Sequence, residues 1–290
     1  MLLTAGLAYA FYGVFSRYMG NDFGPFFQAW SRGILILIIL TIFGIYVGAF
    51  KKIDKKDYKW FLLTALGASL AISPFYIATV NLPIGTALFL FYAFYTIFSF
   101  LIGKFSFNEK LTVNKLTSLI LSLIGLFLLL QANLQIYKLF YILAAGISGS
   151  IFSLFTVLSK KISQKYSGIQ ISWFSFLILI VINFALSVLF NDKTNYMLFS
   201  TSWLANYGYA VAQVTAALLV IKGFKYIEAQ KGSIILLSEV LFAVLLGFIF
   251  FKEIPNILSL IGGFLILCAM ILQSLNYNFK VSKVKNIKRQ

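Results

Sequence analysis

Two ionisable side chains lie inside long apolar stretches of this sequence. Glu239 lies deep in the run 232–251, and Arg32 lies near the start of the run 28–50, beside Trp30. An ionisable group at the depth of membrane hydrocarbon is costly, so it marks a functional position by default. Glu239 fits a protonatable coupling or gating group, a partner for a cationic substrate, or a structural acceptor. Arg32 fits a gate or a ligand of a substrate carboxylate, although an arginine near a helix end can also snorkel to the interface.

Polar and aromatic residues recur at helical spacing in four other apolar runs, so each set lies on one helix face. The sets are Tyr9, Tyr12 and Ser16; Tyr92, Tyr95 and Ser99; Gly149, Ser153 and Thr156; and Asn206, Tyr209 and Gln213. Tyr76 and Asn81 follow Pro74, whose missing amide can kink a helix. Ordinary helix packing or interfacial anchoring explains each set alone, whereas a shared polar cavity explains all four.

We therefore expect a substrate cavity within the membrane, with a gate or carboxylate-binding group at its entrance. The expected substrate-binding residues are Glu239, Tyr9, Tyr12, Tyr76, Asn81, Tyr92, Tyr95, Ser153, Tyr209 and Gln213, and the expected gate residues are Arg32 and Trp30. The chain contains no histidine and a single cysteine, Cys268. Histidine is the commonest general base and metal ligand, so we expect neither catalysis nor a metal or cofactor.

The elements that must position these residues are membrane helices. Of the 290 residues, 61% are hydrophobic and 11% are charged, and the mean hydropathy is +0.93. Soluble domains are about 45–50% apolar, so a water-soluble fold is excluded. Uncharged runs long enough to cross a bilayer predict an all-α membrane protein with ten transmembrane helices. The predicted spans are 1–19, 28–50, 58–78, 84–103, 113–131, 137–158, 169–190, 203–221, 232–251 and 256–276.

Lysine and arginine are distributed unevenly between alternate connections. One side of the membrane collects 19 of these residues and the other side 5. Because basic flanking residues favour the cytoplasmic face, we expect both termini in the cytoplasm and a multi-pass protein of the plasma (inner) membrane. These loops also explain the net charge of +16, so no nucleic-acid partner is expected.

An internal repeat divides the chain into two halves. Glu109 and Glu253 each follow an apolar run and are 144 residues apart. We therefore expect a first five-helix repeat at 1–135, a second at 136–278 and a basic cytoplasmic tail at 279–290. An odd number of spans in each repeat makes the second repeat enter the membrane upside down. Inverted repeats are typical of transporters that alternate between inward-open and outward-open states.

Three stretches of the sequence resemble a known family. The stretch 231–263, the stretch 27–32 that ends in Arg32 and the Phe91-Tyr92 pair are similar to the EamA-type carriers of the drug/metabolite transporter superfamily. Members often have a proline after the intramembrane glutamate, where this chain has Val240. The resemblance implies a central cavity, alternating access between the halves, and transport of amino acids, other small metabolites or drugs.

The leading hypothesis is a secondary transporter that exports small organic solutes, such as amino acids or related metabolites. An exporter of drugs or cationic amphiphiles is the alternative, since one acid lies among tyrosines. A membrane-embedded enzyme and a purely structural membrane protein are alternatives of another class. The expected partners are a small-molecule solute and the lipid bilayer, and the expected assembly is a monomer or a homodimer.

Overall fold

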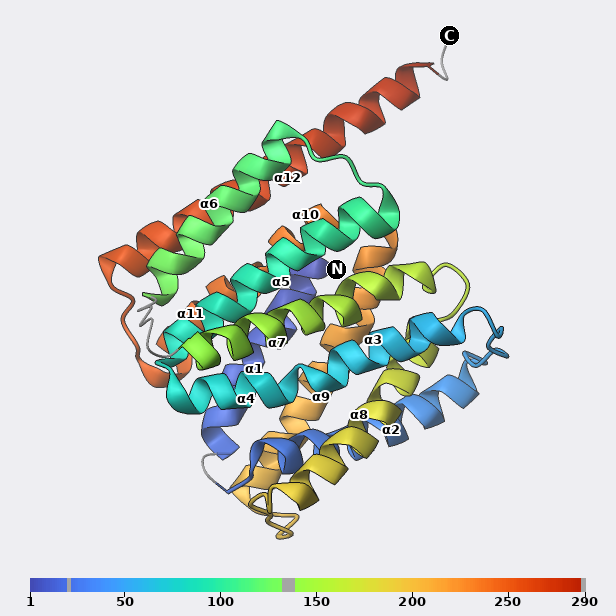
Figure 1. Cartoon of the computed structure of the whole chain (residues 1–290), viewed down its shortest axis with the longest axis vertical. Coiled ribbons are helices and arrows are strands. Elements are labelled where there is room, and N and C mark those ends of the chain that lie inside the picture. The colour runs from blue at the N-terminus through green and yellow to red at the C-terminus, as the bar shows by residue number, and fades with distance from the viewer. Residues whose placement is uncertain (20–21, 132–138, 288–290) are drawn as a thin grey trace.

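The chain folds into a bundle of long α-helices in a computed structural model (Figure 1). The structure describes residues 1–19, 22–131 and 139–287, and side chains only up to residue 273. The helices in these residues are α1 (Leu2–Met19), α2 (Pro25–Tyr46), α3 (Tyr58–Leu70), α4 (Ile72–Asn81), α5 (Ile84–Phe107), α6 (Val113–Leu130), α7 (Leu139–Leu158), η2 (Ser159–Lys161), α8 (Gly168–Leu189), α9 (Thr201–Tyr226), α10 (Ala229–Leu236), α11 (Ser238–Phe251) and α12 (Ile257–Ile287). No strand occurs in this described part.

Eight of these segments are long and apolar enough to cross a membrane. Two of the eight combine consecutive helices, α3 with α4 and α10 with α11, and one extends α7 through η2. α1 and the apolar part of α12, Ile257–Gln273, fall below the same threshold. The all-helical membrane architecture therefore agrees with the sequence prediction, and the count of ten spans stays a prediction. The predicted tail at 279–290 lies outside the residues whose side chains are described.

Two of the spans are broken inside the membrane segment. α3 gives way to α4 at Ala71, because Pro74 has no amide for the carbonyl of Leu70 and its ring crowds that carbonyl. α10 gives way to α11 at Leu237 without a proline, and the Leu237 amide bonds to the Ile234 carbonyl three residues back. The second break places Glu239 in the first turn of α11.

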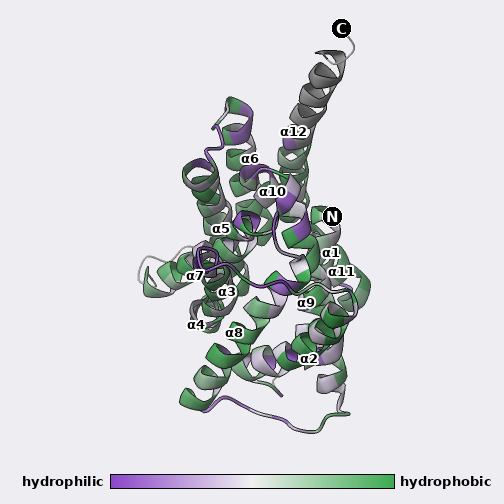
Figure 2. Cartoon of the chain, turned by 90° about the vertical axis from the view of Figure 1, so that its right-hand side faces the viewer, coloured by the Kyte–Doolittle hydropathy of each residue, from purple (hydrophilic) through white to green (hydrophobic). Residues whose placement is uncertain are grey.

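Neighbouring helices pack in pairs across the bundle. α1 lies against α9 and α11, α5 against α7, and α2 against α8, while α6 and α12 pair along one edge (Figure 1). Figure 2 shows that the helices consist mostly of hydrophobic residues and that hydrophilic residues gather mainly in the connections. Exposed large side chains such as Ile42, Phe140 and Leu245 agree with a surface that faces lipid.

Close packing between α5 and α7 gives the first testable prediction. A Cβ atom added at Gly149 would lie within 3.0 Å of backbone atoms of Phe91 and Tyr95. We expect Gly149→Ala to destabilise the bundle by about 1–3 kcal/mol, because two helix backbones would have to move apart. The matched control is Gly13→Ala, since a Cβ at Gly13 meets nothing within 4 Å and alanine favours a helix by about 1 kcal/mol. Denaturation in detergent would test both, and equal stabilities would contradict the prediction.

Candidate functional site

The intramembrane acid Glu239 is hydrogen-bonded to a tyrosine of the first half of the chain. The hydroxyl of Tyr92 on α5 donates to Glu239 Oε1 over 2.7 Å. Tyr92 is buried, whereas Glu239 remains partly exposed. The carboxylate thus has a fixed neighbour on one side and remaining lone pairs for another donor.

Arg32 is buried on α2, and it has no acidic partner among the residues that the structure describes. Its Nε donates to Gln213 Oε1 on α9 over 2.5 Å, and its guanidinium lies 3.8 Å from the centre of the Tyr209 ring. Among the described residues, no carboxylate lies within 4.0 Å of Arg32. A buried cation normally needs a charged or strongly hydrogen-bonding partner. Arg32 is only 5% exposed, so its charge lies inside the bundle.

A cluster of tyrosine rings adjoins both charged groups. Tyr12 stacks on Tyr209 with ring centres 4.2 Å apart, and Tyr9 meets Tyr12 edge-on at 5.1 Å. Tyr9, Tyr92 and Tyr95 share one buried core with Val240, next to Glu239. We call Tyr9, Tyr12, Tyr92, Tyr95 and Tyr209 the tyrosine cluster. Its members come from α1, α5 and α9, so it joins residues from both halves of the chain.

Several polar atoms in and around the tyrosine cluster have unused hydrogen-bonding capacity. The hydroxyl of Tyr12, Nη1 of Arg32 and Oγ of Ser238 are buried and have no partner in the described part of the chain. Leaving a buried donor unpaired costs about 1–3 kcal/mol, so native proteins rarely keep such atoms without a role. The arrangement suits a polar or charged solute that enters among these side chains.

The other predicted site residues lie elsewhere or are already bonded. The Ser153 hydroxyl donates to the carbonyl of Ser150 in its own helix, and the Asn81 amide donates to the Ile77 carbonyl. Tyr76 is 38% exposed and its ring packs against Phe26. The structure therefore groups eight of the twelve predicted residues around Glu239 and Arg32, counting those two. The eight are Glu239, Tyr9, Tyr12, Tyr92, Tyr95, Tyr209, Gln213 and Arg32.

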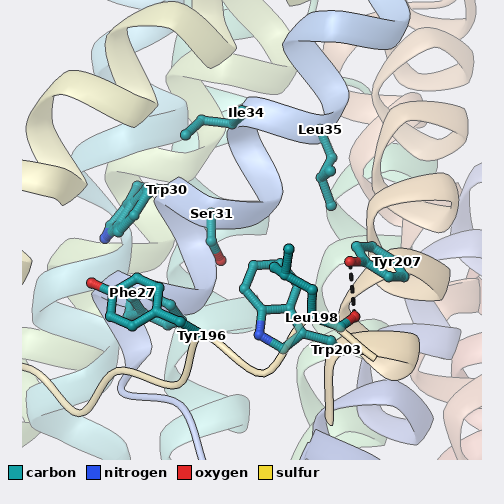
Figure 3. A pocket seen from close by; sticks show the side chains of 9 residues that line it. All are labelled: Phe27, Trp30, Ser31, Ile34, Leu35, Tyr196, Leu198, Trp203 and Tyr207. Atoms are coloured by element: carbon teal, nitrogen blue, oxygen red, sulfur yellow. Dashed lines mark hydrogen bonds between the residues drawn. The ribbon is translucent and has the colours of Figure 1, made fainter. Parts of the chain in front are cut away.

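Trp30 belongs to a separate pocket of about 310 Å³ between α2, α9 and the connection before α9 (Figure 3). Aromatic and aliphatic side chains form nearly all of its wall. The lining residues are Phe27, Trp30, Ser31, Ile34, Leu35, Tyr196, Leu198, Trp203 and Tyr207. The Tyr207 hydroxyl donates to the Leu198 carbonyl and closes one side. Tyr209 packs against the same hydrophobic core as Phe27 and Trp203, so this pocket adjoins the tyrosine cluster.

Sequence reasoning missed two parts of the site. Phe152 on α7 contacts Tyr9 and Tyr95, with ring centres 6.3 Å and 5.8 Å away. The sequence did not single out Phe152, because the chain has 32 phenylalanines and most of them serve in packing or face lipid. Tyr196 and Leu198 line the aromatic pocket from a connection, and only the apolar run 196–199 after the polar residues 191–195 could have indicated a role.

An ionic cluster outside the membrane segments ties two connections together. Lys165 pairs with Asp54 and Asp57, and the Tyr166 hydroxyl donates to Asp57 over 2.8 Å. Hydrogen bonds from Lys165 and Tyr166 lower the pKa of Asp57, and the two aspartates raise the pKa of Lys165. Because a lowered carboxyl pKa stabilises the fold only where the carboxyl is ionised, this contact weakens when the pH falls through the pKa of Asp57.

Apolar spans and a buried charged centre shared between two halves define a multi-pass α-helical membrane protein of the transporter class. The chain belongs to the EamA-like transporter family, whose sequence profile matches residues 1–131 and again 139–275. An uncharacterized transporter of Archaeoglobus fulgidus is 29% identical over 168 residues, which cover 57% of this chain and 58% of that relative's length. A solved crystal structure superposes with a TM-score of 0.83 at 16% identity, covering 94% of this chain and 96% of the other. This last likeness concerns the fold alone.

Proposed function

We propose that this protein is a secondary transporter that exports small organic solutes such as amino acids or related metabolites. The observation that carries the proposal is a buried arginine and an intramembrane glutamate beside one tyrosine cluster. Arg32 offers a planar fork for a carboxylate, and Glu239 offers an acceptor for an ammonium group. Amino acids carry both groups, so they match the chemistry of this site better than a neutral solute does.

The proposed transport mechanism is alternating access between two inverted five-helix repeats, 1–135 and 136–278. Hydrogen bonds and ring contacts that cross between these halves support it. Tyr92 bonds to Glu239, Arg32 bonds to Gln213, and Tyr12 stacks on Tyr209. Rocking of one half against the other would break or remake these contacts at the substrate site. The proposed location is the plasma (inner) membrane, with both termini in the cytoplasm.

An exporter of cationic amphiphiles is a second candidate. The aromatic pocket beside the tyrosine cluster favours it, because a wall of Phe27, Trp30, Trp203 and Tyr207 suits a flat apolar group. Glu239 would then bind the cationic end of the molecule. This candidate leaves the buried charge of Arg32 without a role in recognition.

Counterflow in proteoliposomes separates the two candidates. Vesicles that contain the full chain and are loaded with unlabelled amino acids should accumulate a labelled amino acid at least about tenfold faster than empty vesicles, since bound substrate speeds the exchange of states. Cationic dyes are the comparison substrates. Exchange of dyes without exchange of any amino acid would overturn the metabolite proposal and favour the alternative.

A further inference from the structure

Two glutamates emerge from the same local backbone at opposite ends of the bundle. Asn108 caps the end of α5 and Lys252 caps the end of α11, and both residues have a left-handed backbone, with φ of 53° and 58°. The amide of Glu109 then bonds to the Gly103 carbonyl over 3.0 Å, and the amide of Glu253 bonds to the Gly247 carbonyl over 3.3 Å. The spacing is the same in both turns, so any difference between the two carboxylates comes from their surroundings.

Glu109 fastens the two halves of the chain together. Its side chain is buried and accepts hydrogen bonds from the amides of Ala229 at 2.7 Å and Gln230 at 3.2 Å, which are the first two residues of α10. Lys160 Nζ donates to the same carboxylate over 3.0 Å. A carboxylate at a helix N-terminus satisfies unpaired amides and complements the helix dipole. Figure 1 shows α10 beside α5 at this end of the bundle.

Further charged groups support this contact from neighbouring elements. Lys115 Nζ donates to Gln230 Oε1 over 2.7 Å and pairs with Glu228 at 3.2 Å, while Lys231 pairs with Glu228 at 3.3 Å. Burial acts to raise the pKa of Glu228, but Lys115 and Lys231 outweigh it, and the net direction is downward. Glu228 therefore stays ionised, and α10 begins in a firmly held ionic network.

Glu253 has the matching ion pair but no helix to hold. Its carboxylate pairs with Arg17 at 2.5 Å, as that of Glu109 pairs with Lys160. The side chains of Arg17 and Glu253 are, however, each 52% exposed. A Cβ atom added at Gly103 would contact the side chains of Gln230 and Ala229, so the other half of the chain packs closely against this turn. Around Gly247 the nearest atoms all belong to Glu253 itself.

The start of α5 is the segment that corresponds to the start of α10, since Gly85 and Ala229 are 144 residues apart, as are the two glutamates. The three atoms nearest to a Cβ added at Gly85 all belong to the backbone of Leu130 on α6. Glu109 is thus engaged with the start of α10, whereas the corresponding contact between Glu253 and the start of α5 is not made in the described residues. The end where Glu253 lies is held by other contacts, since Asp192 accepts hydrogen bonds from the amides of Phe26 and Phe27.

We propose that Glu109 and Glu253 are alternating latches of the transport cycle. In the state described here, Glu109 holds α10 and closes the lysine-rich end. In the opposite state, Glu109 no longer accepts hydrogen bonds from the amides of α10. Glu253 instead accepts a hydrogen bond from the amide of Gly85 and closes the other end. This inference rests on the alternating-access function proposed above, and it assigns these two residues to positioning the halves rather than to binding the solute.

Thiol labelling tests the latch without any substrate. The reporter is Ser99→Cys in a Cys268→Ala background, because Ser99 is fully buried on α5, one turn inward from Gly103. In vesicles with the lysine-rich face outward, we expect Glu109→Gln to raise labelling by a membrane-impermeant maleimide about tenfold, since a charge-assisted bond is lost. Labelling within twofold of the parent would overturn the latch.

Ala229→Pro provides a second variant that leaves Glu109 intact. Proline is tolerated at the first residue of a helix, and the preceding residue, Glu228, already has the extended backbone that proline requires. Proline removes the amide hydrogen that residue 229 donates to Glu109. Labelling of the Ser99→Cys reporter should therefore rise as it does for Glu109→Gln. An unchanged rate in a variant that elutes as the parent does would also overturn the proposal.

The matched control is Glu253→Gln, the same change at the corresponding position. We expect it to leave labelling at position 99 equal to or below the parent, and the double variant Glu109→Gln/Glu253→Gln to label less than Glu109→Gln alone, because both closed states are weakened. Equal labelling in the single and double variants would show that Glu253 stabilises neither state.

Transport is measured separately from labelling. Counterflow together with unchanged labelling would reject the latch alone. Altered labelling without any flux of substrate would reject the proposed transport function.

Discussion

Replacing Glu239 by glutamine is expected to lower substrate flux about a hundredfold while the protein still inserts and folds. Glutamine keeps an oxygen that can accept the hydrogen bond from Tyr92, so the contact between α11 and α5 survives. What disappears is the negative charge that would pair with an ammonium group. Truncating one partner of a buried charge pair costs about 2–5 kcal/mol, or roughly 30-fold to several thousandfold in affinity. Initial rates of uptake into proteoliposomes measure the effect.

Tyr92→Phe is the matched control for the Glu239 prediction. It removes the hydrogen bond and leaves the carboxylate, so we expect flux to fall only about tenfold or less, in line with about 1.5 kcal/mol for one hydrogen bond. Thermal unfolding in detergent should place all three proteins within a few degrees of one another. Wild-type flux in Glu239→Gln at every pH would assign Glu239 to structure alone.

The helical architecture could be predicted from the sequence because hydrocarbon imposes a simple rule. Every backbone amide and carbonyl must be satisfied internally, so long uncharged runs become helices whatever their detailed sequence. Helix ends follow local chemistry instead, since Ser167 and Ser200 cap α8 and α9 with their hydroxyls, whereas the predicted span 203–221 falls short of α9 at both ends. The break at Leu237 was not predictable from composition, because no proline or glycine marks it and only tertiary packing selects it.

The candidate site was harder to predict than the fold. Single charges in apolar runs drew attention to Glu239 and Arg32, and helical spacing drew attention to the tyrosines. Spacing defines a face of one helix, however, and leaves open which faces meet. Ser153 shares the spacing of a cavity residue yet bonds to its own helix, and Phe152 beside it contacts the tyrosine cluster instead. Such choices depend on helix rotation, which a sequence pattern does not specify.

Arg32 should decide whether a substrate must carry a carboxylate. Its Nε is engaged by Gln213 and its face by Tyr209, while Nη1 has no partner in the described residues. A carboxylate would supply the missing acceptor in the planar geometry that guanidinium prefers. We therefore expect the wild-type protein to transport an amino acid about a hundredfold faster than its methyl ester, because the ester leaves a buried cation unpaired.

Arg32→Gln should reduce this preference for the acid over the ester to about threefold or less, chiefly by slowing transport of the acid. Arg32→Lys keeps the charge but loses the fork, so it should fall between the two, with a raised KM as its main effect. Gln213→Ala is the control, since it frees Nε and leaves the guanidinium in place. The comparison of acid with ester cancels any general loss of folded protein, because both substrates meet the same preparation. If the wild-type protein handles acid and ester alike, Arg32 holds its neighbours in position and does not recognise the solute.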